Sequence, residues 1–338
     1  LTPDFLGTMF WLVVIMVYYL IATFLPIDKI IGQLYPVFGI CLIIMALGIG
    51  GATIIFRGSD MPELTAAALS VVHPDGLPKW AMMFVTVACG AISGFHATQS
   101  PMMARCITSE KQGRTIFYGA MVAEGIIALI WAAAGVTYYT NHGSLLDGMT
   151  GLTNAIAADG SGGVVFEIST GLLGSVGGVL AMIGVIACPI TSGDTAYRAA
   201  RLTIADWFHI DQSKVGPRAA LSVPLLGVGA VIALALPWDV LWRYFSWSNQ
   251  TLAMIVLWTG AVFLHKYGFP PKACMIAALP ATFMSAVSVT YFFQAPECLN
   301  LYTSIAYPVG IAVAAIFLVI FVWRILIRGK NDIVTNAR

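Results

Sequence analysis

Charged side chains are scarce in this sequence, because Asp, Glu, Lys and Arg together make up only 10% of its 338 residues. An ordinary soluble domain carries about 25% charged residues, so this chain lacks the polar surface of a water-soluble protein. Hydrophobic residues make up 59%, and this excess of apolar side chains indicates that many of them face lipid. The composition predicts an all-α integral membrane protein, because helices satisfy their own backbone groups in lipid.

Several motifs are also absent. The six cysteines form no Cys-x-x-Cys pair, so neither a disulfide framework nor a metal site is predicted. There is no Gly-x-x-x-x-Gly-Lys-Ser/Thr loop, so an ATP-driven pump would need a separate subunit. The net charge is +1 and no basic stripe is present, so no nucleic-acid partner is expected. No cofactor is expected apart from H⁺ or Na⁺ as a coupling ion.

Long apolar runs are abundant. A membrane-spanning helix takes about 20 mostly apolar residues, and we find nine such runs. They are residues 7–25, 36–56, 80–104, 116–140, 164–189, 219–236, 245–264, 274–293 and 307–326. The chain begins with Leu1, and no signal peptide is visible ahead of the first run. We therefore expect about nine transmembrane helices.

Lys and Arg in the loops predict the orientation, because these residues stay on the cytoplasmic side. The positively charged connections are 105–114, 198–218, 266–272 and the tail 324–338. The loops 141–163, 237–244 and 294–306 hold one arginine, Arg243, among four acidic residues. Strict alternation through nine spans fits this pattern. It predicts a multi-pass protein of the inner (plasma) membrane with a cytoplasmic C-terminus.

The loop at 57–79 is predicted to be external. Residues 61–72 suit one short amphipathic helix lying on the membrane face, ended by the turn sequence from His73 to Gly76. An ordinary connector is an equally good interpretation.

The third run is interrupted between Gly90 and Pro101, where two glycines, a histidine, several hydroxyls and a proline fall within one span. A broken helix is tolerated in a membrane only where it lines a cavity or packs against protein. The interruption therefore predicts a functional site. His96 could exchange protons near neutral pH, or it could be a hydrogen-bonded packing element.

The fifth run ends at Pro189, and a hydroxyl-rich turn follows it. This turn contains Thr191, Ser192, Asp194 and Thr195. Oxygen ligands at such a place suit a small hard cation. A milder interpretation is that the hydroxyls bond back to carbonyls freed by Pro189.

Glu124 lies about 13 Å along its helix from the preceding basic loop, at 1.5 Å per residue. That depth is close to the bilayer centre, where a carboxylate is costly and usually faces a polar interior. Glu124 is therefore predicted to be a protonatable site, and a purely structural pairing with Arg105 or His96 is the alternative. Asn249 and Gln250 follow an aromatic cluster that fits the interfacial belt, and they could bind solute or a neighbouring broken helix.

Four of these segments together resemble the carbon starvation protein A (CstA) family of membrane carriers. The matching motifs are ACGAISGFHATQSPMMAR from Ala88, YGAMVAEG from Tyr118, CPITSGDTAYRAAR from Cys188 and WSNQTLAM from Trp247. The resemblance implies a secondary transporter rather than an enzyme. Such a carrier would import peptides or pyruvate-like carboxylates in the carbon starvation response, coupled to H⁺ or Na⁺.

The resemblance also implies the fold of amino acid/polyamine/organocation carriers, with two inverted five-helix repeats and an unwound first helix in each. Residues 1–56 would be the last two helices of the first repeat, and 57–79 the external loop. Residues 80–264 would be the second repeat, and 265–338 two further helices with a cytoplasmic tail. Three helices of the first repeat would be missing, so we expect the sequence to be N-terminally incomplete.

By this resemblance the substrate site is lined by Ser93, Gly94, Phe95, His96, Thr98 and Gln99. From their place after the aromatic cluster, Asn249 and Gln250 are added as further candidate substrate-binding residues. Half-helix ends there would offer N–H groups to a carboxylate. Thr191, Ser192, Asp194 and Thr195 fall where related carriers coordinate a Na⁺ ion. Glu124, from its depth in the membrane, is the candidate for proton coupling.

Two other functional classes are alternatives to a transporter. An intramembrane hydrolase could use His96, Ser100 and Cys106, but Pro101 breaks the geometry and no Gly-x-Ser-x-Gly elbow exists. A membrane nutrient sensor signalling through a partner protein is the alternative function, although the tail after Arg328 holds only about ten residues. The expected partners are a small-molecule substrate and the lipid bilayer, and homo-oligomerisation stays open.

Overall fold

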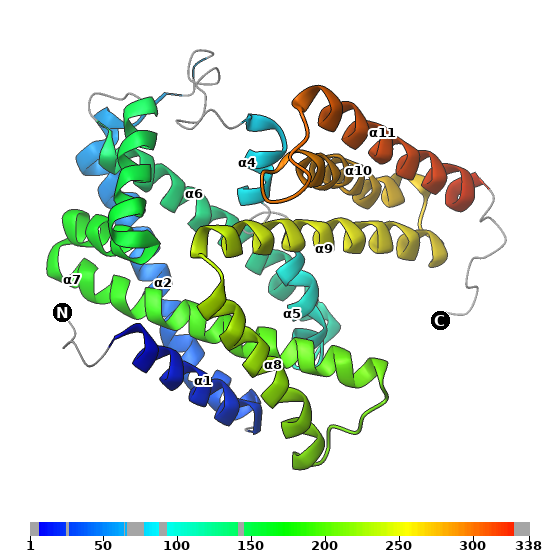
Figure 1. The fold of residues 1–338 in the computed structure, drawn as a ribbon, viewed down its shortest axis with the longest axis horizontal. Helices are drawn as coiled ribbons and strands as arrows, with labels where there is room; N and C mark the ends of the chain where they lie inside the picture. Colours follow the sequence, from blue (N-terminus) through cyan, green and yellow to red (C-terminus); the bar gives the residue numbers. More distant parts are fainter. Residues whose placement is uncertain are drawn as a thin grey trace. The chain divides into compact units, whose positions relative to one another are not determined.

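The computed structural model describes residues 7–24, 27–63, 65, 78–87, 93–140 and 145–327 (Figure 1). Within these ranges every regular element is a helix. Six of the described helices are long and apolar enough to cross a membrane, and α1 (Thr8–Phe24) is apolar but shorter. The all-helical membrane architecture is confirmed, whereas neither the count of nine spans nor the inverted-repeat fold is.

The chain forms two compact units, and each one joins two separate stretches of sequence. The first unit is residues 1–75 and 125–235, and the second is residues 76–124 and 236–338. The predicted repeat boundaries and the membrane orientation stay predictions. Of the amphipathic helix predicted over 61–72, residues 61–63 and 65 are described and are not helical, and the others lie outside the described residues.

The first unit is built around α2 and α7. Its elements are α1, α2 (Ile27–Arg57), the short η1 (Gly58–Asp60), most of α6 (Gly119–Tyr139), α7 (Leu145–Trp207) and α8 (Val215–Ala235). A hydrophobic core of buried side chains joins α2, α6 and α7, with Met45, Ile49, Ala134 and Ile168 among its members. The apolar runs predicted from the sequence therefore supply both this core and the exposed apolar surfaces of the unit.

Two glycines break α7 into three helical segments. Gly160 and Gly174 have φ values of 70° and 65°, in the left-handed region that glycine enters without a steric penalty. The apolar run predicted at 164–189 contains Gly174, so the helix changes direction inside it. A hydrophobicity pattern does not report a change of direction at a small residue.

The second unit contains the broken span. Its elements are α4 (Lys79–Val87), α5 (Gly94–Ala104), η2 (Glu110–Gln112), η3 (Arg114–Tyr118), the start of α6, α9 (Trp238–Lys266), α10 (Pro271–Gln294), α11 (Thr303–Phe321) and η4 (Val322–Ile327). Figure 1 shows α9, α10 and α11 side by side, as their contacts require. The indole N–H of Trp258 on α9 donates to Ser285 Oγ on α10 at 2.9 Å.

The predicted interruption of the third run is present in the structure. α4 ends at Val87, α5 begins at Gly94, and Ser93 between them is extended with φ −101° and ψ 127°. Residues 88–92, which include Gly90, lie outside the described residues. Among the described residues, the helical path of the run at 80–104 is interrupted at Ser93.

Candidate functional site

Ser93 caps the start of α5. Its hydroxyl oxygen accepts a hydrogen bond from the backbone N–H of Phe95 at 3.1 Å, which satisfies one of the unpaired N–H groups at a helix start. The same oxygen accepts from the side-chain amide of Asn249 on α9 at 3.1 Å. Ser93 is 7% exposed and so is Asn249, so this polar contact is buried between the two helices.

Gly94 allows the backbones of α5 and α9 to approach closely. A Cβ atom on Gly94 would lie 2.2 Å from the carbonyl oxygen of Asn249 and 2.8 Å from Cβ of Leu252. Those distances are shorter than van der Waals contact, so a larger residue would push the helices apart. The glycine fixes the position of the α5 N-terminus against Asn249.

The side chains of His96 and Glu124 meet between α5 and α6. The distance from His96 Nε2 to Glu124 Oε2 is 2.5 Å, so the two atoms share a short hydrogen bond. The side chains are 27% and 45% exposed respectively, so both remain accessible at the surface of their unit. His96 Nδ1 is buried and has no hydrogen-bond partner among the described residues.

The other predicted substrate residues have varied environments. The Thr98 hydroxyl donates to the Phe95 carbonyl at 2.9 Å within α5. Gln250 is fully buried, and neither polar atom of its amide has a hydrogen-bond partner among the described residues. The amide nitrogen of Gln99 is also buried without a partner in the described part of the chain. The second unit thus places Ser93 and Gly94 against Asn249, and His96 against Glu124.

The hydroxyl turn of α7 makes internal hydrogen bonds. Thr191 Oγ1 donates to the Cys188 carbonyl at 2.9 Å, and Thr195 Oγ1 lies 3.1 Å and 3.0 Å from the carbonyls of Thr191 and Ser192. This is the arrangement of the milder interpretation. The hydroxyl oxygens keep lone pairs, with which they can also coordinate a cation.

Asp194 in the same turn is paired with an arginine. Its Oδ1 lies 3.4 Å from Nη2 of Arg198, and the two side chains are 5% and 7% exposed. Among the described residues, no group of three or more His, Cys, Asp and Glu side chains could hold a metal ion. The carboxylate of Asp194 already has a positive partner within the protein.

Two arginines that the sequence analysis did not single out cap the C-terminal end of α1. Arg198 Nη2 donates to the Ala22 carbonyl at 3.0 Å, and Arg201 Nη1 donates to the Thr23 carbonyl at 3.1 Å. The last carbonyls of a helix lack internal partners and attract cations. The spacing of three residues, which puts both arginines on one face of α7, is the signal that could have identified them.

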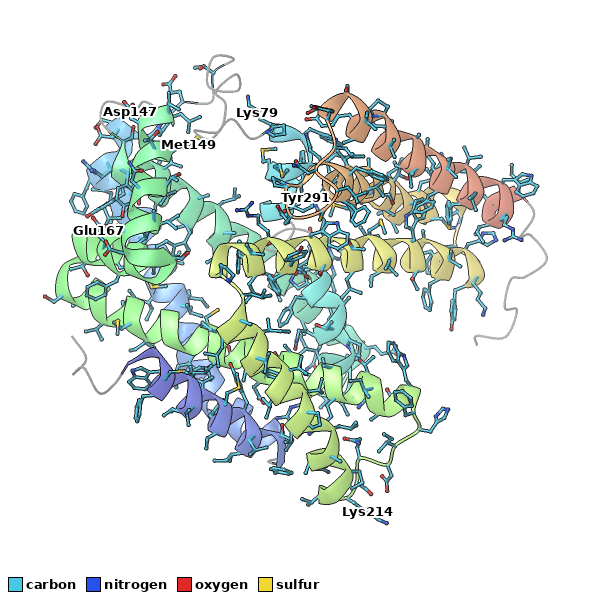
Figure 2. The ribbon with its side chains drawn as sticks, in the orientation of Figure 1. Lys79, Asp147, Met149, Glu167, Lys214 and Tyr291 are labelled. Carbon is cyan, nitrogen blue, oxygen red and sulfur yellow. The ribbon has the colours of Figure 1, made fainter. Side chains whose placement is uncertain are left out.

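A second overlooked network surrounds Glu297. Its carboxylate accepts a short hydrogen bond from the Tyr291 hydroxyl (Figure 2) and lies 3.4 Å from Arg243 Nη1. The Tyr244 hydroxyl donates to the Glu297 carbonyl at 2.8 Å. Next to it, burial and the Glu297 charge raise the pKa of the Cys298 thiol. These contacts hold the loop after α10 against α9.

Comparison with known proteins identifies the family. The family model described as "Carbon starvation protein CstA" matches residues 5–176, which is about half of the chain. The chain belongs to the carbon starvation protein CstA family. This family match includes α5, His96 and Glu124. Together with the long apolar helices, membership makes the chain a multi-pass membrane protein.

Several relatives are similar over parts of their length. An uncharacterized membrane protein of Haemophilus influenzae is 40% identical over 159 residues, covering 41% of this chain and 42% of that protein. The peptide transporter CstA of Helicobacter pylori is 27% identical over 270 residues, covering 62% and 38%. The pyruvate/proton symporter BtsT of Escherichia coli K12 is 33% identical over 116 residues, covering 32% and 13%.

The chain therefore spans less than half the length of each of these three relatives. No solved structure matches the chain.

Proposed function

We propose that the protein is a secondary active transporter of the plasma membrane that imports a pyruvate-like carboxylate or a peptide together with protons. Two relatives are named as a peptide transporter and as a pyruvate/proton symporter, which supports this class of solute. The proposal places the C-terminus in the cytoplasm, from the bias of Lys and Arg in the loops. It also assigns the uptake to the carbon starvation response.

The hydrogen bond between His96 and Glu124 carries the proposal. A neutral imidazole and an ionised carboxylate carry one negative charge between them, and one added proton makes the pair neutral. A neutral pair costs less to keep in a membrane interior than a charged one. Proton binding at a 2.5 Å contact beside the broken helix can therefore favour the reorientation of the loaded carrier.

The start of α5 supplies the proposed solute contacts. Helix N-termini attract anions through free N–H groups and the helix dipole, and this one is fixed by Ser93 and Gly94 against Asn249. Gln250, fully buried and without a partner in the described part of the chain, would add amide donors and acceptors. These groups suit a carboxylate or a peptide bond.

Coupling to sodium through Thr191, Ser192 and Thr195 is the competing version. We favour protons because Asp194 is already engaged by Arg198 and the two threonine hydroxyls point to backbone carbonyls. Glu124, in contrast, contacts His96, a residue type that gains and loses protons near neutral pH. The sodium version requires the turn to rearrange around the ion.

Uptake by proteoliposomes tests the proposal. Labelled pyruvate and labelled di- and tripeptides would be offered under an imposed proton or sodium gradient, with the Escherichia coli pyruvate/proton symporter as the positive control. Accumulation driven by the proton gradient is the expected result. Accumulation that needs sodium would indicate that the coupling ion is Na⁺, bound at the hydroxyl turn of α7. No accumulation while the control is active would favour the nutrient-sensor alternative.

A further inference from the structure

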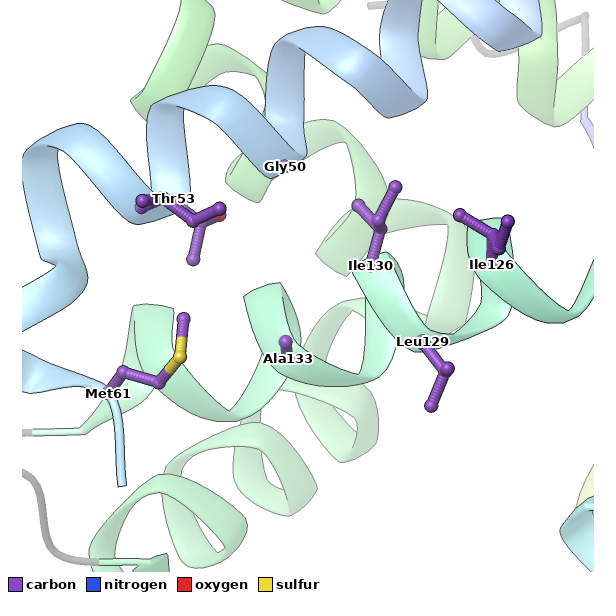
Figure 3. Close-up of a pocket in the computed structure, with 8 residues that line it drawn as sticks. Gly50, Thr53, Met61, Ile126, Leu129, Ile130 and Ala133 are labelled. Carbon is purple, nitrogen blue, oxygen red and sulfur yellow. The ribbon is translucent and has the colours of Figure 1, made fainter. Parts of the chain in front are cut away.

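An open apolar groove of about 250 Å³ lies between α2 and α6 in the first unit (Figure 3). Gly50, Thr53 and Ile54 line it from α2, and Ile130 and Ala133 are among the residues that line it from α6. Among the side chains that line the groove, only that of Thr53 carries a hydrogen-bonding group. None of the residues proposed for transport lines the groove.

The side chain of Ile130 on α6 packs against Gly50 of α2. A Cβ atom on Gly50 would lie 3.3 Å from that side chain. A Cβ atom on Gly51, the next residue, would meet no atom within 4 Å. The absence of a side chain at Gly50 therefore leaves room for Ile130 beside the groove.

The surroundings of the groove are those of a lipid-facing surface. α2 and α6 both contain segments long and apolar enough to cross a membrane. Ile54 and Leu129 on its rims are 67% and 72% exposed. The groove of about 250 Å³ is lined almost entirely by apolar side chains, so it suits an apolar occupant. The hydrocarbon chain of a lipid is such an occupant, and it is the one that surrounds a membrane-spanning helix.

The order of chemical groups along α2 identifies the rest of the occupant. Thr53 and Arg57 are four residues apart and share one helix face, separated by about 6 Å along the axis. Thr53 is 3% exposed, and its hydroxyl has no hydrogen-bond partner among the described residues. A phospholipid would meet three kinds of partner here: the apolar lining for its acyl chain, the Thr53 hydroxyl for its ester, and the Arg57 guanidinium for its phosphate.

Arg57 retains capacity to bind an anion. Its guanidinium contacts Asp60 at 3.2 Å and donates to the Tyr138 carbonyl at 2.8 Å. An arginine offers five N–H donors, so further donors remain, and the side chain is 37% exposed. We propose that the groove binds one acyl chain of a membrane phospholipid, with Thr53 donating to the ester carbonyl and Arg57 facing the phosphate.

Photochemical cross-linking tests this proposal without a transport assay. The protein would be reconstituted in phosphatidylcholine vesicles doped with a phosphatidylcholine that carries a diazirine in its acyl chain, and cross-linked residues would be mapped by mass spectrometry. Ala133→Trp should fill the groove and lower cross-linking to residues 50–61 several-fold. Ala132→Trp adds the same side chain at an exposed neighbour outside the groove and should leave it unchanged.

The remaining outcomes are equally decisive. Thr53→Val keeps the shape of the side chain and removes the hydroxyl, so it should lower the labelling with the fold intact. Equal labelling in the parent and Ala133→Trp, or an equal loss in both tryptophan variants, would overturn the proposal and indicate unspecific boundary lipid. Disulfide formation between two copies of an Ala133→Cys variant, without lipid labelling, would show that a second copy covers the groove and would also overturn it.

Discussion

The carbonyl oxygen of Asn249 lies 2.2 Å from the position that a Cβ atom on Gly94 would occupy. This is a contact between the first residue of α5 and the backbone of α9. It is reinforced one residue earlier by the hydrogen bond from the Asn249 amide to Ser93. The contact with α9 therefore fixes the position where α5 begins. It also orients the residues of α5 that follow, including His96.

Gly94→Ala is expected to destabilise the protein. The added methyl must displace a backbone carbonyl, and overpacking of this kind costs about 1–3 kcal/mol. Thermal unfolding in detergent would measure the change. Gly260→Ala on α9 is the matched control, because a Cβ there meets no atom within 4 Å, and it should be neutral or slightly stabilising. A Gly94→Ala variant as stable as the parent would refute the close contact.

Glu124→Gln is expected to abolish proton-driven accumulation. Glutamine can still hydrogen-bond to His96, but it cannot take up a proton. Solute binding should survive, so exchange of labelled for unlabelled solute without any gradient should continue. Normal accumulation by this variant would remove Glu124 from coupling. Glu110→Gln, which changes an exposed carboxylate of η2 in the same unit, should behave like the parent.

The sequence predicted the helical class and the break in the third run because both have local causes. Apolar runs of spanning length determine the class, and a cluster of Gly, Ser and Pro residues disfavours a continuous helix. The pairing of Glu124 with His96 was one of two interpretations, since the spacing of 28 residues joins different helices. Deciding between His96 and Arg105 required the packing of α5 against α6.

Other features could not be predicted because they depend on contacts between distant segments. The bend at Gly174 requires a positive φ, which composition does not report. The capping of α1 by Arg198 and Arg201 joins residues more than 170 positions apart. The charge pattern predicts Arg198 and Arg201 in a loop, whereas the structure places both in α7 and buries them within the first unit.

Arg201→Met is expected to loosen the end of α1. Hydrogen bonds from charged groups contribute about 1.5–3 kcal/mol, and the Thr23 carbonyl would lose its donor. Hydrogen exchange of the α1 amides should accelerate, and thermal stability should fall. Lys214→Met is the control, because Lys214 is exposed in the loop before α8 (Figure 2). Unchanged exchange in α1 would show that the arginine does not cap the helix.

Arg198→Met should destabilise more than Arg201→Met. It removes the bond to Ala22 and also leaves the Asp194 carboxylate buried without its partner, a change that costs about 3–5 kcal/mol. Adding Asp194→Asn should recover part of the loss, because the unpaired charge is then gone. A double-mutant cycle on thermal unfolding would measure the coupling. Strictly additive effects would show that the pair contributes nothing to stability.

Cys298 tests both the orientation and the environment of the loop after α10. The predicted topology puts this loop outside, so an impermeant maleimide should label Cys298 in intact cells and Cys106 only after permeabilisation. Labelling in the reverse order would invert the topology. The thiolate is the reactive form, and burial together with the Glu297 charge raises the thiol pKa, so Cys298 should react slowly at neutral pH.

The rate of this labelling should increase as the pH is raised, because a larger fraction of the thiol is then ionised. Leu299→Cys in a Cys298→Ser background provides the comparison, since Leu299 is 49% exposed and lies one residue further along the same loop. At neutral pH the new cysteine should react several-fold faster than Cys298, and the difference should narrow at alkaline pH. Equal rates at neutral pH would mean that Glu297 and burial do not suppress ionisation of the native thiol.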